Sequence, residues 1–183
     1  MEQISTKEKL ILAGMDEIRA YGIEGFSLRR VASRCGVSCG APYKHFRDKE
    51  DMFGAMIRYV RDRWIEEYNN LEPTGDVTAD AAEYSLRFVK FLLANPHYKS
   101  VLMIKQMGLD SPEGTPEPGI GIQAKRIFAR YRKETGRSRE DVRARMFVAR
   151  ALAFGAALTL DPDEDLKKEG EEIVRKAFIA IFE

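Results

Sequence analysis

Apolar residues at helical spacing mark the first predicted element, a helix over residues 5–21. Its inward positions are Leu10, Ile11, Met15 and Ile18. Ser5 is followed three residues later by Glu8, which is the pattern of a capping box at a helix start. Gly22 then interrupts the apolar pattern, so we expect the helix to end there.

Two short helices around a glycine turn are predicted next. Ser27 is a suitable N-cap for a helix that ends at Gly36. Ser38 is a suitable N-cap for a third helix that continues through Phe46, with Pro42 in its first turn. The inward residues of the second helix would be Leu28, Val31, Ala32 and Cys35. Such a pair is typical of a helix-turn-helix.

The rest of the chain also has helical periodicity. Asp48 is expected to cap a long helix over residues 49–71 that links the two halves of the protein. Further helices are predicted over residues 81–93, 101–107, 122–135, 138–160 and 163–182, with a loop rich in Gly and Pro over 108–121. No stretch alternates like a β-strand, so we expect an all-α fold of about nine helices.

The predicted helix over residues 138–160 is apolar on two faces. One stripe holds Val142, Met146, Ala149, Ala153, Ala156 and Leu160. The other holds Phe147, Ala151, Phe154 and Leu158. A helix that is apolar on two faces must bury both, one against its own core and the other against another surface. We therefore expect a homodimer in which the last two helices of each subunit form a four-helix bundle.

Charge is distributed unevenly although the net charge is only +1. The segment from residue 26 to residue 49 contains six basic residues and a single acidic one, Asp48. Such a basic segment indicates a nucleic-acid partner. The two cysteines are too few for a disulfide framework, and no apolar stretch reaches the roughly 18 residues of a membrane span. We therefore expect a cytoplasmic protein with no membrane partner.

Residues 10–53 resemble the DNA-binding domain of the TetR family. The matching positions are Gly22, Ser27, Val31, Ala32, Gly36, Val37, Ser38, Gly40, Tyr43, His45, Phe46, Lys49, Glu50, Met52 and Phe53. The resemblance implies an N-terminal three-helix DNA-binding domain, here residues 1–50. A long helix would join it to a helical ligand-binding and dimerisation domain, here residues 51–183. It implies a ligand-responsive transcriptional regulator, most often a repressor, that binds a palindromic operator as a homodimer.

The expected DNA contacts lie around the second and third helices. They are Ser27, Arg29, Ser38, Cys39, Gly40, Ala41, Tyr43, Lys44, His45 and Lys49. The resemblance implies that Ser27, Arg29, Tyr43 and Lys49 hold phosphates, and Lys44 is the best candidate for a base or phosphate donor. Ala41 is small enough to approach the groove floor and to place its methyl group against a thymine methyl. Phe46 is expected in the core.

The second half of the chain carries no motif that identifies a ligand. Aromatic and Met side chains suit an adaptable apolar pocket between helices, which would take a small apolar or aromatic effector. The candidate ligand residues are Trp64, Tyr68, Phe88, Met103, Gln106, Met107, Phe128, Phe147 and Arg150. Arg150 lies between the two apolar stripes, where an unpaired charge is costly, so it could orient a ligand, form an ion pair or face the dimer partner.

Other functions have less support in the sequence. Cys35, Cys39 and His45 could suggest a metal or redox site. They are only three residues, however, and a complete zinc site needs four ligands. No catalytic motif is visible, so we expect neither an enzyme nor a cofactor. A helical carrier or interaction protein with a vestigial helix-turn-helix is the alternative, although a carrier has no need of the basic segment.

Overall fold

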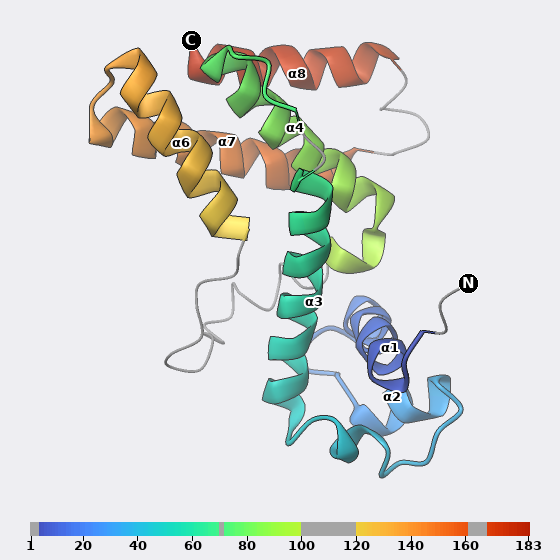
Figure 1. The fold of residues 1–183 in the computed structure, drawn as a ribbon. Helices are drawn as coiled ribbons and strands as arrows, with labels where there is room; N and C mark the ends of the chain where they lie inside the picture. The colour runs from blue at the N-terminus through green and yellow to red at the C-terminus, as the bar shows by residue number, and fades with distance from the viewer. Residues whose placement is uncertain (1–3, 70–71, 100–119, 161–167) are drawn as a thin grey trace. The chain divides into compact units, whose positions relative to one another are not determined.

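The computed structural model describes residues 4–69, 72–99, 120–160 and 168–183, and these are helices joined by turns without any β-strand. The predicted all-α class is confirmed. The chain divides into two compact units (Figure 1). The first unit comprises residues 1–62 and 96–116, and the second comprises residues 63–95 and 117–183. The division falls within a helix, after Asp62, whereas the sequence placed the domain boundary at residue 50.

The first unit begins with two helices that contact each other, α1 (Thr6–Tyr21) and α2 (Leu28–Arg34). Both have the serine N-caps that the sequence predicted. The Ser5 hydroxyl oxygen accepts the Glu8 N–H at 3.1 Å, and the Ser27 hydroxyl oxygen accepts the Arg30 N–H at 3.4 Å. Gly36 follows α2 with a φ of 66°, a left-handed conformation that glycine adopts without strain.

The third predicted helix is shorter and tighter than expected. Instead of an α-helix through Phe46, the structure has the 3₁₀ helix η1 (Pro42–Lys44), and Ser38 does not cap it. The Ser38 carbonyl oxygen instead accepts the Ala41 N–H at 2.9 Å, which makes a turn of the 3₁₀ type. Pro42 has no N–H to donate, and so short a segment cannot offset the cost of starting an α-helix.

The long helix α3 (Lys49–Asn69) begins in the first unit, as predicted. Its capping residue Asp48 accepts the Asp51 N–H through Oδ1 at 2.7 Å. A Cβ at Gly14 would overlap the terminal methyl groups of Met52 and Met56, so this glycine lets α1 approach α3 closely. The core of the first unit includes Leu10, Met15, Val31, Ala32, Phe46, Met52, Phe53 and Met56. The expected burial of Phe46 is thus confirmed.

The second unit is built around α4 (Val77–Ala94), which contacts α6 (Ile120–Thr135), α7 (Arg139–Thr159) and α8 (Lys168–Phe182) (Figure 1). Asp76 caps α4, so this helix starts four residues before the predicted position. The predicted helix over residues 101–107 lies outside the described residues. So do residues 108–119 of the predicted loop and the predicted start of the last helix.

Trp64 forms the centre of an aromatic cluster in the second unit. Its ring is fully buried and contacts the rings of Tyr84, Phe88 and Phe91 with centroid separations of 5.0 to 5.4 Å. The indole N–H donates to the Tyr84 hydroxyl at 3.4 Å. Since the polar edge of the indole has a partner, the whole side chain can be buried without cost to its N–H. None of the helices described is long and apolar enough to cross a membrane.

We expect Ser138→Ala to lower the free energy of unfolding of the second unit by about 1 kcal/mol. The Ser138 hydroxyl accepts the Asp141 N–H at 3.1 Å at the start of α7, and alanine would leave that donor without its partner. Chemical denaturation measures the change. Ser138→Asp keeps a capping oxygen and should match the parent protein, and equal losses in both variants would contradict the capping role.

Candidate nucleic-acid interface and effector pocket

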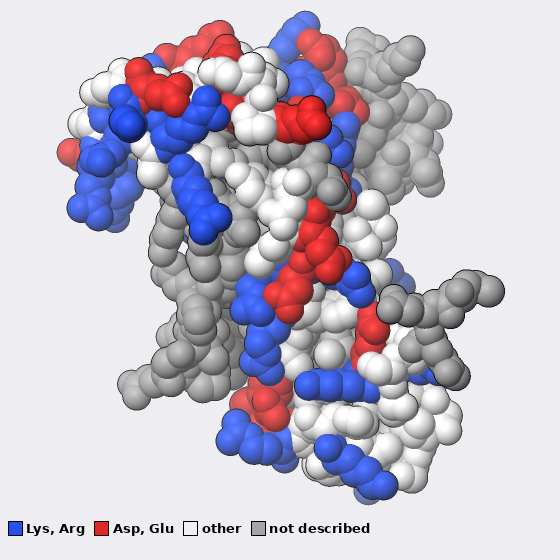
Figure 2. Space-filling model, viewed as in Figure 1, with Lys and Arg blue, Asp and Glu red and all other residues white. Residues whose placement is uncertain are grey.

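The exposed side chains of the first unit include most of the predicted DNA contacts. Tyr43 is 61% exposed, and Arg29 and Lys44 are also exposed. The side chains of these three residues have no hydrogen bond or ion pair with any residue in the described part of the chain. Ser38, Cys39, Gly40 and His45 are exposed around them, whereas Ser27 and Ala41 are half-buried. Figure 2 shows Lys and Arg side chains on this unit, at the lower end of the view, among uncharged residues and some acidic ones.

Arg30 has a structural role that separates it from Arg29. Its guanidinium donates to the Glu17 carboxylate and to the Gly25 carbonyl oxygen, and it stacks over the Tyr21 ring at 4.4 Å. These contacts connect α2 to α1 and to the turn between them. Arg30 is therefore committed to the fold, while its neighbour Arg29 remains available to a partner.

Glu17 is a buried acid that the sequence reading missed. Its side chain is fully buried, and its second carboxylate oxygen lies 3.5 Å from the Arg34 Nε. Glu17 falls next to Ile18 on the inward side of α1, so a charge on an otherwise apolar face was the available signal. By pairing with Arg30 and Arg34, Glu17 fixes the basic side of α2 against α1.

Lys49 is held inside the first unit. Its Nζ donates to the Ile23 carbonyl oxygen at 2.8 Å and lies 5.4 Å from the centre of the Phe53 ring and 5.7 Å from that of Phe26. The lysine thereby connects the start of α3 to the turn after α1. A phosphate contact by Lys49 stays a prediction, and its substitution would also disturb the fold.

The two cysteines lie in different environments. Cys35 is half-buried and its thiol donates to the Lys9 carbonyl oxygen at 3.5 Å, whereas Cys39 is exposed. Burial raises the pKa of the Cys35 thiol, and the nearby Lys9 charge opposes this only in part. In the described residues, no group of three or more His, Cys, Asp or Glu side chains could hold a metal ion.

Iodoacetamide should alkylate Cys39 faster than Cys35 near neutral pH. The reactive species is the thiolate, and a raised pKa keeps more of Cys35 protonated at a given pH. Mass spectrometry of timed digests measures both rates. In denaturant the two rates should converge, and faster labelling of Cys35 in the folded protein would contradict the described burial.

Those predicted ligand residues that the structure describes do not gather around one cavity. Trp64, Phe88 and Phe128 are buried in the core. Phe147 is 63% exposed on α7, and Arg150 is exposed beside it with its guanidinium 6.0 Å from the centre of that ring. The expected cost of burying Arg150 therefore does not arise in the single chain. Met103, Gln106 and Met107 lie outside the described residues.

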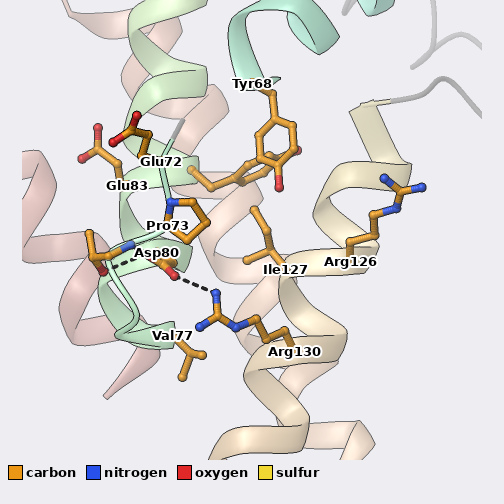
Figure 3. A pocket seen from close by; sticks show the side chains of 11 residues that line it. Tyr68, Glu72, Pro73, Val77, Asp80, Glu83, Arg126, Ile127 and Arg130 are labelled. Atoms are coloured by element: carbon orange, nitrogen blue, oxygen red, sulfur yellow. Dashed lines mark hydrogen bonds and ion pairs between the residues drawn. The ribbon is translucent and has the colours of Figure 1, made fainter. Parts of the chain in front are cut away.

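A pocket of about 170 Å³ does open in the second unit (Figure 3). The end of α3, the turn before α4, the start of α4 and the middle of α6 line it. Its walls are Tyr68, Glu72, Pro73, Thr74, Val77, Asp80, Glu83, Tyr84, Arg126, Ile127 and Arg130. Tyr68 is the one predicted ligand residue among them. The others were missed because the chain segments that form the pocket are far apart in sequence.

In the described part of the chain, α7 and α8 carry large apolar side chains that are exposed, and these side chains are called the apolar face of α7 and α8 below. Phe147, Leu158 and Ile173 are 63%, 61% and 62% exposed, and Val148 is 49% exposed. Phe147 and Leu158 belong to the second apolar stripe that the sequence predicted on this helix, and Ala151 of that stripe is exposed too. Large apolar side chains exposed together are typical of a protein–protein contact.

Comparison with known proteins relates both the sequence and the fold to bacterial regulators. Residues 10–56 match the family model of bacterial regulatory proteins of the tetR family. The HTH-type transcriptional repressor AcnR of Corynebacterium diphtheriae is 30% identical over 117 residues, which cover 59% of this chain and 62% of AcnR. An HTH-type transcriptional regulator of Staphylococcus aureus is 26% identical over 68 residues, which cover 37% of each chain.

Solved structures share the fold over nearly the whole chain. A transcriptional regulator from Rhodococcus sp. Rha1 aligns with a TM-score of 0.65 at 23% identity, covering 97% of this chain and 96% of that one. A TetR family regulator from Shewanella sp. PV-4 aligns with a TM-score of 0.69 at 20% identity, with the same coverage. The match over residues 10–56 places α2, the turn at Gly36 and η1 in the part of the chain that resembles a helix-turn-helix regulator. Over residues 10–56 the chain is thus similar to bacterial regulatory proteins of the tetR family, and over nearly its whole length it shares the fold of these solved structures.

Proposed function

We propose that this protein is a ligand-responsive repressor that binds a palindromic DNA operator as a homodimer. The observation that carries the proposal is that the side chains of Arg29, Tyr43 and Lys44 are exposed and have no polar partners among the described residues. The side chains of Arg30 and Lys49 on the same unit form hydrogen bonds within the protein. The lack of partners is therefore not common to all basic side chains of this unit. Unpaired cations beside a phenol are what a phosphate backbone binds.

The proposed contacts are of two kinds: contacts to phosphates, which position the protein on the DNA, and contacts to base edges, which recognise the sequence. Arg29, Tyr43 and the Ser27 hydroxyl would hold phosphates and fix the register of the unit on the duplex. Lys44 and the small residues Gly40 and Ala41 would face the major groove, where Lys44 can donate to guanine acceptors. With so few side chains able to read base edges, DNA shape should contribute to operator choice.

Dimerisation is proposed to occur through the apolar face of α7 and α8. Phe147, Leu158 and Ile173 would leave water on pairing with the same face of a second copy, which completes a four-helix bundle. The dimer would present two helix-turn-helix units about one DNA turn apart, near 34 Å, to the two halves of the operator.

Effector control follows from differential binding. A small molecule that binds the second unit more tightly in a dimer unable to span the operator lowers DNA affinity by mass action, which relieves repression. A TetR variant of Acinetobacter baumannii with the same fold was solved in complex with minocycline, which supports ligand binding by this fold.

Fluorescence anisotropy with the DNA upstream of the protein's own gene tests the proposal across a salt series. We expect tight binding that weakens steeply as salt rises, because cations on the protein displace condensed counterions from DNA. Unrelated DNA of equal length is the control. Equal and weak affinity for both DNAs, with the same salt dependence, would contradict operator recognition at that site.

A further inference from the structure

The pocket in the second unit has the size of a single ring. Its volume of about 170 Å³ is close to that of an engineered apolar cavity of roughly 150 Å³ that holds benzene. Tyr68 and Tyr84 pack edge to face in its wall, with ring centres 5.5 Å apart. Val77 and Ile127 line it as aliphatic residues. A flat ring can therefore fill it against aromatic and aliphatic surfaces.

Most charged groups of the pocket already have partners. Asp80 accepts the Thr74 N–H and hydroxyl through Oδ1, each at 2.7 Å, and the Arg130 Nη1 through Oδ2 at 3.0 Å. Arg130 also binds Glu134 at 2.7 Å. Glu83 pairs with Arg175 and lies 3.6 Å from Arg87. These groups are committed to holding the walls together, so they are poor candidates for binding a ligand.

Arg126 and the Tyr68 hydroxyl differ from these paired groups of the pocket. Neither the Arg126 guanidinium nor the Tyr68 hydroxyl has a hydrogen bond or an ion pair with another residue of the described ranges. In Figure 3 the Tyr68 hydroxyl points toward Ile127, and Arg126 lies on the opposite side of the pocket from Glu72 and Glu83. One side of the pocket thus offers a cation and a hydroxyl donor, while the acidic side chains of Glu72 and Glu83 lie on the other side.

We propose that this pocket binds a monocyclic carboxylate. The ring would occupy the space between Tyr68, Val77 and Ile127, and the carboxylate would lie on the Arg126 side. There it would accept from the guanidinium, which matches a carboxylate in a bidentate way, and from the Tyr68 hydroxyl. The inference rests on the proposed function in one respect, namely that occupancy of this pocket is the signal for release from DNA.

Three probes with the same ring test the chemistry. Benzoate, benzyl alcohol and benzylamine carry an anionic, a neutral and a cationic group on one phenyl ring. We expect isothermal titration calorimetry to show benzoate binding at least about tenfold more tightly than the other two, because only a carboxylate forms a charged pair with Arg126. Trp64, the single tryptophan, packs on Tyr84 and should report the same titration by fluorescence.

Two variants locate the site. Arg126→Gln should weaken benzoate binding roughly tenfold and remove the preference over benzyl alcohol. Arg132→Gln removes an exposed arginine from the same helix outside the pocket, and it should leave both unchanged. Ile127→Trp fills the cavity and should abolish binding of all three probes.

The inference is overturned by three results: no benzoate binding, equal affinity for the three probes, or unchanged affinity in Arg126→Gln. DNA binding is measured separately on the same samples. Failure to bind any DNA would refute the proposed function without affecting the ligand titration. A selective benzoate site that leaves DNA affinity unchanged would support the pocket's chemistry and refute its role in release.

Discussion

Arg29→Ala/Lys44→Ala should bind operator DNA at least about 100-fold more weakly than the parent protein. Hydrogen bonds to charged groups contribute roughly 1.5 to 3 kcal/mol each, and a dimer would lose two from each subunit. Both side chains are exposed and without partners in the described structure, so their truncation should leave the fold intact. Anisotropy titrations at several salt concentrations should also show a shallower salt dependence, because fewer counterions are displaced.

The matched control is Arg132→Ala/Lys133→Ala. These residues are exposed near the end of α6 in the second unit, and their removal lowers the net charge by the same two units. If charge alone drives binding, both double variants lose affinity equally, and the proposed interface is wrong. If the interface is as proposed, the control binds like the parent protein.

Phe147→Glu/Leu158→Glu is expected to convert the protein from a dimer to a monomer. Each side chain is more than half exposed in the single chain, so the substitutions cost the isolated subunit little. In a two-fold symmetric dimer, four carboxylates would be buried in an apolar contact without partners, which opposes association strongly. Light scattering after size exclusion measures the mass, and operator affinity should fall with it because two half-sites are no longer bound together.

Ala129→Glu/Arg132→Gln is the control for this variant. It changes the net charge equally at exposed positions of α6, a helix that carries none of the residues of the apolar face. The control should remain dimeric. A dimer of unchanged mass in Phe147→Glu/Leu158→Glu would contradict the assignment of this face, as would a parent protein that is monomeric at micromolar concentration.

Sequence reasoning succeeded where the determinants are local. The capping serines Ser5, Ser27 and Ser138 and the capping residue Asp48 each act on a backbone N–H within three residues, so their spacing predicts the helix starts. The helix expected through Phe46 failed for a local reason as well. A proline and a glycine in so short a segment favour a 3₁₀ turn over an α-helix, whereas the prediction relied on Ser38 as an N-cap and on Pro42 in the first turn.

The site was harder to predict because its parts are distant in sequence. Exposure of Tyr43 and Lys44 followed from the basic pattern, but the hydrogen bond from Lys49 to the Ile23 carbonyl oxygen depends on how α3 meets the turn after α1. The pocket around Ile127 depends on α6 approaching the turn before α4, more than fifty positions away in the chain. Trp64 was predicted to bind a ligand because it is aromatic, but its ring packs in the core of the second unit.

Selection of bound sequences from a random DNA pool tests the central claim most directly. A protein that acts as the proposed dimeric repressor should enrich a two-fold symmetric site whose half-sites lie about one helical turn apart, roughly 10 base pairs from centre to centre. Arg29→Ala/Lys44→Ala should enrich nothing under the same conditions. Failure of the parent protein to enrich any sequence, or enrichment of a single half-site without symmetry, would contradict operator binding by a homodimer.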